Sequence, residues 1–130
     1  MDLSLEEIID RVGNKGYTFT RAIMRGARTK ENFIKQRFLV LDFDEGMSEE
    51  KFKRRCTELR LSYVFMYRTL SWSKTEERFR AVFLMENWIE NSQVAYIIND
   101  MLYRIFPESD KSCRDITKLF LGGKKVVDIN

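Results

Sequence analysis

Histidine is absent from the 130-residue sequence. Its absence excludes Ser-His-Asp triads, zinc sites with histidine ligands, and the paired-histidine metal site of rolling-circle replication nucleases. If the protein binds a metal, the ligands must therefore be mainly oxygen atoms. Oxygen ligands favour Mg²⁺ or Mn²⁺ over the softer transition metals.

Cysteine, proline and long apolar runs are also scarce. The two cysteines, Cys56 and Cys113, lie far apart and in no metal-binding spacing, so we interpret them as reduced thiols of a cytoplasmic protein. One proline and six glycines argue against disorder or a long linker. No apolar run approaches the length of a membrane span, and the acidic, amphipathic start "MDLSLEEIID" predicts no signal peptide. We expect a cytoplasmic protein that does not enter a membrane.

The composition is that of an ordinary globular domain. Hydrophobic residues make up 44% and charged residues 33% of the chain, which is long enough for one domain with its own core. The net charge is +3 and the isoelectric point is about 8.9. This mild excess of positive charge is compatible with binding to nucleic acid, but it does not establish such binding.

Hydrophobic periodicity predicts a short first helix and then six regular elements. The first helix follows Ser4, which has capping-box spacing to Glu7, and residues 14–35 are predicted to be irregular, with room for one short strand. The predicted elements are a strand at 37–43, a helix at 49–59, a strand at 63–67, a strand at 78–84, a helix at 92–106 and a final strand at 118–121 and 124–129, broken at Gly122 and Gly123.

This order, β-α-β-β-α-β, predicts an α+β fold of the ferredoxin-like or RNA-recognition-motif type. This fold, which is also that of the polymerase palm, has a four-stranded antiparallel sheet with both helices on one face. Right-handed crossovers give the strand order four-one-three-two. We expect residues 36–130 to form this core and residues 1–35 to form an N-terminal extension that packs on it, within a single domain.

The topology predicts a cluster of acids and arginines at one edge of the sheet. Asp42 and Asp44 are two residues apart at the end of the first strand, so both point to one face. Two neighbouring carboxylates repel each other unless a cation lies between them. The same edge should receive three further segments: the loop with Ser71, the strand start with Arg78 and Arg80, and the segment with Asp110.

Each of these residues also has an ordinary structural interpretation. Aspartate is common in turns, so Asp42 and Asp44 could simply end a strand. Arg78 and Arg80 could form a solvated face with local ion pairs. Asp110 could cap a loop, and Asp115 is an alternative third acid. The convergence of acids and arginines on one edge is what favours a site for a divalent cation and a phosphate group.

Three blocks of the sequence resemble one known family. "FLVLDFDEG", "YRTLSWSKTEERFRAVF" and "ESDKSCRDITKLFLGGKK" are similar to the successive blocks of archaeo-eukaryotic primase-like, or primase-polymerase, domains. The closest similarity is to the variant at the N-terminus of replication proteins of plasmids, phages and integrated mobile elements. The stretch "RGARTKENFIKQRFLVLDFD" also resembles the segment that leads into that variant. The resemblance covers about residues 17–127.

The resemblance implies roles for particular residues. Asp42, Asp44 and Asp110 match the acids that bind the catalytic metal ions, Mg²⁺ or Mn²⁺. The middle block often reads Ser-x-His and binds the nucleotide phosphates, but here it reads Ser71-Trp72-Ser73. The loss of the histidine puts efficient polymerisation in doubt. The expected nucleotide-binding residues are Ser71, Ser73, Arg78, Arg80 and Lys118.

The leading hypothesis is a nucleotidyltransferase domain of the primase-polymerase type. It would act on nucleoside triphosphates and a DNA template, with helicase or other replication domains as expected partners. A second hypothesis is a non-catalytic nucleic-acid-binding module of a replication initiator, which the basic and aromatic stretch "GYTFTRAIMRGARTKENF" supports. A third, a haloacid-dehalogenase-type phosphatase, shares the D-x-D motif but would require Gly-Thr or Gly-Val after it and a parallel sheet.

Overall fold

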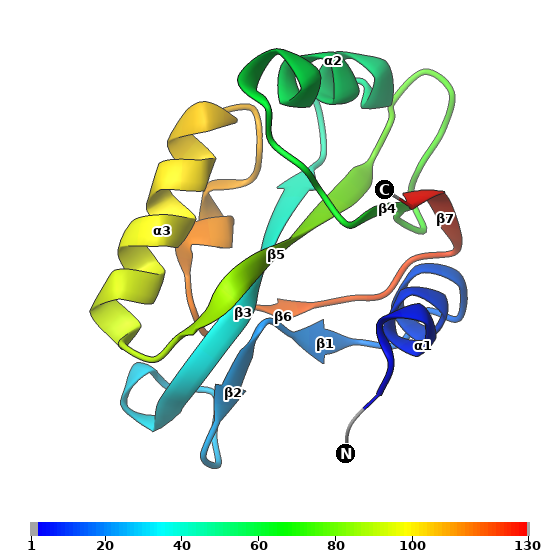
Figure 1. Ribbon diagram of the computed structural model, residues 1–130. Coiled ribbons are helices and arrows are strands. Elements are labelled where there is room, and N and C mark those ends of the chain that lie inside the picture. The colour runs from blue at the N-terminus through cyan, green and yellow to red at the C-terminus, as the bar shows by residue number, and fades with distance from the viewer. Residues whose placement is uncertain (1–2, 130) are drawn as a thin grey trace.

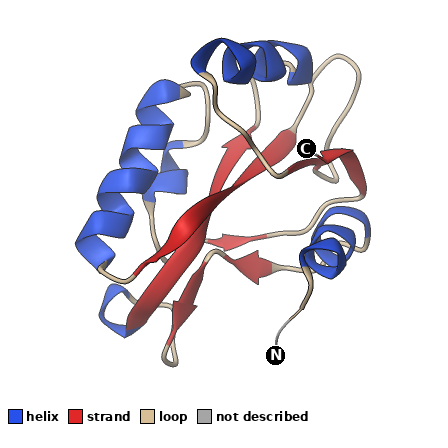
Figure 2. Ribbon diagram, in the orientation of Figure 1, coloured by secondary structure: helices blue, strands red, loops and turns tan. Residues whose placement is uncertain are grey.

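The computed structural model describes residues 3–129, which form helices and two β-sheets (Figures 1 and 2). None of the helices in these residues is long and apolar enough to cross a membrane. The elements, in chain order, are α1 (Leu5–Ile9), the π-helical turn η1 (Asp10–Asn14), β1 (Phe19–Thr20), β2 (Ala22–Met24), the 3₁₀ turn η2 (Lys30–Asn32), β3 (Phe33–Phe43), α2 (Glu49–Leu59), β4 (Phe65–Arg68), β5 (Phe79–Ile89), α3 (Ser92–Ile105), the 3₁₀ turn η3 (Lys111–Arg114), β6 (Leu119–Phe120) and β7 (Lys125–Ile129).

The main sheet is antiparallel throughout, and its strand order is β2-β3-β5-β4-β7; β1 and β6 form a separate two-stranded sheet. The α+β class is confirmed, as is the central arrangement in which β5 lies between β3 and β4. The expectation of a four-stranded sheet is wrong, because the sheets have five and two strands. The last strand was expected beside β3, but β7 pairs with β4, and β2 takes the place beside β3.

The path of the chain through Gly122 and Gly123 explains the displaced last strand. A Cβ atom on Gly123 would lie 2.3 Å from the ring of Tyr67, and one on Gly122 would lie 2.3 Å from the backbone of Gly16. Only glycine allows so close an approach. The chain therefore leaves β6, passes against β4 and reaches the outer edge of that strand, where Lys124 N–H donates to the carbonyl of Arg68 at 3.1 Å.

The two central strands are longer than their sequence pattern predicts. Both β3 and β5 have 11 residues. Residues 14–35, predicted to be irregular with room for one short strand, hold two short strands, β1 and β2, and the first three residues of β3. A register shift between Gln36 and Phe38 breaks the alternation of side chains. Gln36 is also buried and polar, and its amide bonds Asn99 of α3 at 2.9 Å. Because a polar residue occupies a buried position, hydrophobic periodicity does not predict this part of the strand.

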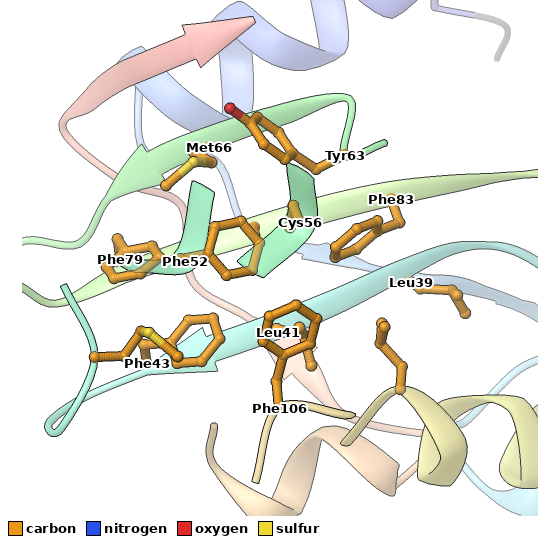
Figure 3. Close-up of a cluster of buried hydrophobic side chains, with 13 residues drawn as sticks. Leu39, Leu41, Phe43, Phe52, Cys56, Tyr63, Met66, Phe79, Phe83 and Phe106 are labelled. Atoms are coloured by element: carbon orange, nitrogen blue, oxygen red, sulfur yellow. The ribbon is translucent and has the colours of Figure 1, made fainter. Parts of the chain in front are cut away.

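The predicted helices are confirmed, with α3 ending one residue early. Ser48 caps α2 by accepting from Lys51 N–H, and Asn91 caps α3 by accepting from Gln93 and Val94. Both helices pack on one face of the main sheet, where aromatic rings fill the core (Figure 3). Phe52 of α2 lies among them, with ring centroids 5.1 Å from Phe106 and 5.8 Å from Phe79.

The opposite face of the sheet, which neither helix of the predicted fold would cover, is also covered. A second cluster joins this face to the N-terminal helical turns and to β6; it consists of Ile9, Val12, Val40, Phe65, Tyr67, Val82, Cys113 and Phe120. The covering segments carry few consecutive apolar residues, and β1 and β6 have two residues each. Strands this short have no measurable period, so the sequence gives no sign that they cover the sheet.

The aromatic core predicts that substitutions at two positions of α2 differ strongly in their effect on the free energy of unfolding. Phe52 has no exposed surface and Leu59 is 51% exposed. Phe52→Ala should lower the free energy of unfolding by about 3–5 kcal/mol because it leaves a cavity among packed rings. The matched control, Leu59→Ala, should change it by no more than about 0.5 kcal/mol. Urea denaturation followed by circular dichroism measures both, and similar losses for the two variants would contradict this description of the core.

Candidate metal centre

Three acidic side chains meet at the end of β3. Asp42 is buried in the strand, Asp44 is exposed just beyond it, and Asp110 is half-buried ahead of η3. One carboxylate oxygen from each lies within 4.8 Å of the others. The grouping survives the displaced last strand because Asp110 N–H donates to the carbonyl of Asp42 at 2.8 Å. The structure therefore brings together the three acids that the sequence selected.

Asp42 faces two cations from other elements. Its Oδ1 lies 3.2 Å from Nε of Arg80, its cross-strand partner on β5, and its Oδ2 accepts from the same guanidinium at 3.4 Å. The Nζ of Lys118 lies 4.0 Å from Oδ2. The Nε to Oδ1 contact is a charge pair without hydrogen-bond alignment, so Oδ1 is buried without a directed donor. A buried oxygen in this state is available to a metal ion.

Burial and neighbouring charge shift the pKa values of two of the acids in opposite directions. Burial raises the pKa of Asp42, and the charge of Asp44 adds to this, while Arg80 and Lys118 offset only part of it. The pKa of Asp110 is lowered, chiefly because its carboxylate accepts the Ser112 N–H at 2.8 Å. The negative charge on Asp42 is therefore held at a cost in free energy, which a bound divalent cation would remove.

Arg80 is buried in a network that also ties down the chain after β6. Only 12% of its side chain is exposed, and it donates to the carbonyl of Leu121. The hydroxyl of Tyr67 donates to that same carbonyl at 3.0 Å, and burial raises the pKa of Tyr67 to about 12, so this hydroxyl stays protonated at neutral pH. The guanidinium is thus fixed next to the acids before any ligand arrives.

Three of the predicted phosphate-binding residues, Arg78, Ser71 and Ser73, are engaged by partners other than the acids. Arg78 forms an ion pair with Glu76 at 3.1 Å. The hydroxyl of Ser71 contacts that of Thr69, and the hydroxyl of Ser73 accepts from Glu76 N–H at 3.1 Å. Within residues 3–129, none of these three side chains has a hydrogen bond or ion pair to Asp42, Asp44 or Asp110.

Asp115, the alternative third acid, is likewise outside the group. Its carboxylate accepts from the backbone N–H and the hydroxyl of Thr117, at 2.9 and 2.8 Å. It therefore closes a local turn, which is a common role for aspartate. Asp110, not Asp115, is the acid that joins Asp42 and Asp44.

A polar network that was not predicted from the sequence fixes the loop between β4 and β5. Glu49, the first residue of α2, is only 7% exposed and accepts from both Arg68 and Trp72. The guanidinium of Arg68 also lies 3.9 Å from the centroid of the Trp72 ring. Arg68 and Trp72 follow Glu49 by 19 and 23 residues in the chain, so no local sequence pattern predicts these contacts. The network holds this loop on the N-terminus of α2.

A polar cleft opens between that loop and the turn after β3. Its volume is about 640 Å³. It is lined by Glu45, Gly46, Met47, Ser48, Lys74, Thr75, Glu76 and Glu77. Since Glu45 directly follows Asp44, the cleft begins next to the acid group along the chain.

The opposite pKa shifts predict opposite effects of two charge-neutralising variants in metal-free buffer. Because the pKa of Asp42 is raised, the folded protein loses stability as the pH rises and Asp42 ionises. Asp42→Asn should therefore be at least as stable as the parent at neutral pH. Asp110 contributes stability that is lost only as the pH falls through its lowered pKa, so Asp110→Asn should be less stable at neutral pH.

Thermal unfolding at several pH values in a chelator measures both effects. The difference between Asp42→Asn and the parent should shrink as the pH falls toward the ordinary range of aspartate. A loss of stability in Asp42→Asn that matches that of Asp110→Asn would contradict the assigned pKa shifts.

Comparison of the chain with protein-family models, with curated proteins and with solved structures returns no match.

Proposed function

We propose that this chain is a metal-dependent nucleotidyltransferase domain of the primase-polymerase type. The observation that carries the proposal is the group formed by Asp42, Asp44 and Asp110, whose oxygens lie within 4.8 Å of one another. An all-oxygen ligand set of this kind suits Mg²⁺ or Mn²⁺. The resemblance of the three sequence blocks to primase-like domains supports the same interpretation.

The fit of a divalent cation to these residues rests on the structure of the acid group. Asp42 supplies a buried oxygen without a directed donor, and Asp44 supplies an exposed carboxylate. Asp110 keeps its charge to low pH. In the proposed reaction the metal ions would activate a 3′-hydroxyl and neutralise the departing diphosphate. The protein would contribute positioned carboxylates and a site that excludes much of the water around Asp42.

Arg80 and Lys118 are the cations best placed to meet the phosphates of a nucleotide. Both already contact Asp42, and their side chains are only 12% and 18% exposed. With a divalent cation held by Asp42, Asp44 and Asp110, Arg80 and Lys118 would be the charged donors beside it that could meet phosphate oxygens, in place of the missing histidine of the Ser-x-His block.

The fold supports this proposal in its central part. The order β3, α2, β4, β5, α3 follows the ferredoxin-like pattern of a palm, with both helices on one face. The displaced β7 and the added β2 depart from that pattern. In this proposal the substrates are nucleoside triphosphates and a DNA template. A helicase or another replication domain of a mobile element is the expected partner, and the cytoplasm is the expected location.

A second candidate is a replication-initiator module that binds nucleic acid without catalysis. The contact that favours it is the buried pair of Asp42 and Arg80, in which a protein cation already occupies one side of the acid group. A haloacid-dehalogenase-type phosphatase is not supported, because that fold requires a parallel sheet and the main sheet here is antiparallel.

Removal of two carboxylates tests the metal site directly. Asp42→Asn combined with Asp44→Asn should abolish Mn²⁺-dependent binding of a nucleoside triphosphate, because the remaining acid cannot hold the ion. Titration calorimetry measures the binding, and circular dichroism checks that the fold is kept. Asp115→Asn, outside the group, is the matched control. Equal heats for the double variant and the parent would refute the assignment.

Arginine variants test the phosphate site. Arg80→Ala should weaken nucleotide binding at fixed Mn²⁺ by about ten- to a hundred-fold, because a charge-assisted bond is worth roughly 1.5–3 kcal/mol. Arg80→Lys should recover only part, since an ammonium lacks the planar fork. Arg78→Ala, whose parent side chain pairs with Glu76, should have the smaller effect. Unchanged affinity in both alanine variants would favour the non-catalytic module.

A further inference from the structure

A second cleft opens beside Asp110, on the side of the molecule formed by α3, η2 and η3. Its volume is about 580 Å³. It is lined by Lys30, Tyr96, Asp110, Lys111, Ser112, Arg114, Asp115, Ile116 and Thr117. Because Asp110 belongs both to this lining and to the acid group, the cleft adjoins the candidate metal centre.

Three cations and two carboxylates, Asp110 and Asp115, line this cleft, and two of the cations form no ion pair among residues 3–129. Lys30 and Lys111 are exposed, on opposite elements, and neither has a carboxylate partner within residues 3–129. Arg114 is shared: it pairs with Asp100 at 3.5 Å, and its guanidinium lies over Tyr103. The lining of the cleft therefore contains two exposed ammonium groups without an ion pair, those of Lys30 and Lys111, and one guanidinium that is held by an ion pair, that of Arg114.

The segment that supplies Lys30 is the most basic part of the chain. Residues 21–37 hold six cations, namely Arg21, Arg25, Arg28, Lys30, Lys35 and Arg37, against one acid, Glu31. None of the six forms an ion pair in the part of the chain that the structure describes. Arg28 ties this segment to the far wall, because it donates to the carbonyl of Thr117 at 2.7 Å. Of these six residues, Lys30 lines the cleft, and Arg28 holds the segment against it.

An aromatic side chain stands in the same lining. Tyr96 of α3 is 44% exposed, although a tyrosine packed in a core would be covered. Proteins that bind single-stranded nucleic acid without strong sequence preference combine a basic groove for the backbone with aromatic rings on which bases stack. Both parts are present here, and the hydroxyls of Ser112 and Thr117 add further polar groups to the lining.

We infer that this cleft binds a single strand of nucleic acid and leads it to the acid group. Lys30 and Lys111 contact phosphates, and Tyr96 stacks against a base. A strand fits better than a lone triphosphate, because Lys30 and Lys111 come from two different elements, η2 and η3, and the Tyr96 ring adds an apolar surface to the lining. The inference rests on the proposed function only for the reason why a strand should reach the acids.

The experiment measures binding of a dye-labelled, single-stranded oligodeoxynucleotide of mixed sequence by fluorescence anisotropy, in a chelator so that metal plays no part. The double variant Lys30→Ala, Lys111→Ala should bind at least about tenfold more weakly, and the slope of log affinity against log salt should flatten by about 1.4, for two lost phosphate contacts. Tyr96→Ala should bind about five- to a hundred-fold more weakly with little change in that slope.

Matched controls use residues of the same type elsewhere on the surface. Lys124 and Lys125 are exposed, at and just before the start of β7. The double variant Lys124→Ala, Lys125→Ala should bind like the parent. Circular dichroism confirms that each variant is folded.

Three outcomes would overturn the inference. The parent fails to bind the oligonucleotide, or the cleft variants bind as tightly as the controls, or a free nucleoside triphosphate displaces the strand at equal concentration. Failure of the proposed function is seen separately. If strand binding depends on the cleft while no variant or parent binds Mn²⁺ with nucleotide, the inference stands and the nucleotidyltransferase proposal falls.

Discussion

The antiparallel pairing of β3 with β5 is the constraint on which the rest of the structure depends. Its register places Asp42 opposite Arg80 and Phe43 opposite Phe79. Adjacent residue pairs point to opposite faces of the sheet. The pair Asp42 and Arg80 therefore belongs to the candidate site, and the next pair, Phe43 and Phe79, belongs to the aromatic core. A slip of one residue would send the rings to the face that carries Asp42 and would send Asp42 into the aromatic core, so the burial of Phe43 and Phe79 also fixes the acid group.

Local signals predicted the parts of the fold that local chemistry determines. Caps at Ser48 and Asn91 and the apolar stripes behind them gave both long helices. The acids were grouped correctly for a reason that does not depend on the last strand: the backbone of Asp110 bonds that of Asp42. The two-residue period of a strand predicts that Arg78 and Arg80 point to the same face, but their partners differ. Arg80 lies within the paired strand, opposite Asp42, whereas Arg78 precedes the strand and pairs with Glu76.

Long-range packing determined what the sequence did not predict. The close passage of Gly123 against Tyr67 redirects the last strand, and no pattern of neighbouring residues encodes it. The N-terminal helical turns and β6 cover the second face, where Asp42 is buried and the guanidinium of Arg80 lies over the ring of Phe120. This cover changes the electrostatics of the site, since it raises the pKa of Asp42 and strengthens each charge contact beneath it. An open site would have neither property.

The tether between Asp110 and Asp42 has a consequence for redesign. It is made by main-chain atoms, at 2.8 Å, so the spacing of the two positions does not depend on their side chains. The donor atoms can therefore be exchanged while the scaffold is kept. Histidine at position 44, which is exposed, would turn an all-oxygen set into a mixed nitrogen and oxygen set. Such a set would shift the preference from Mg²⁺ toward Zn²⁺, and would give the chain its first imidazole.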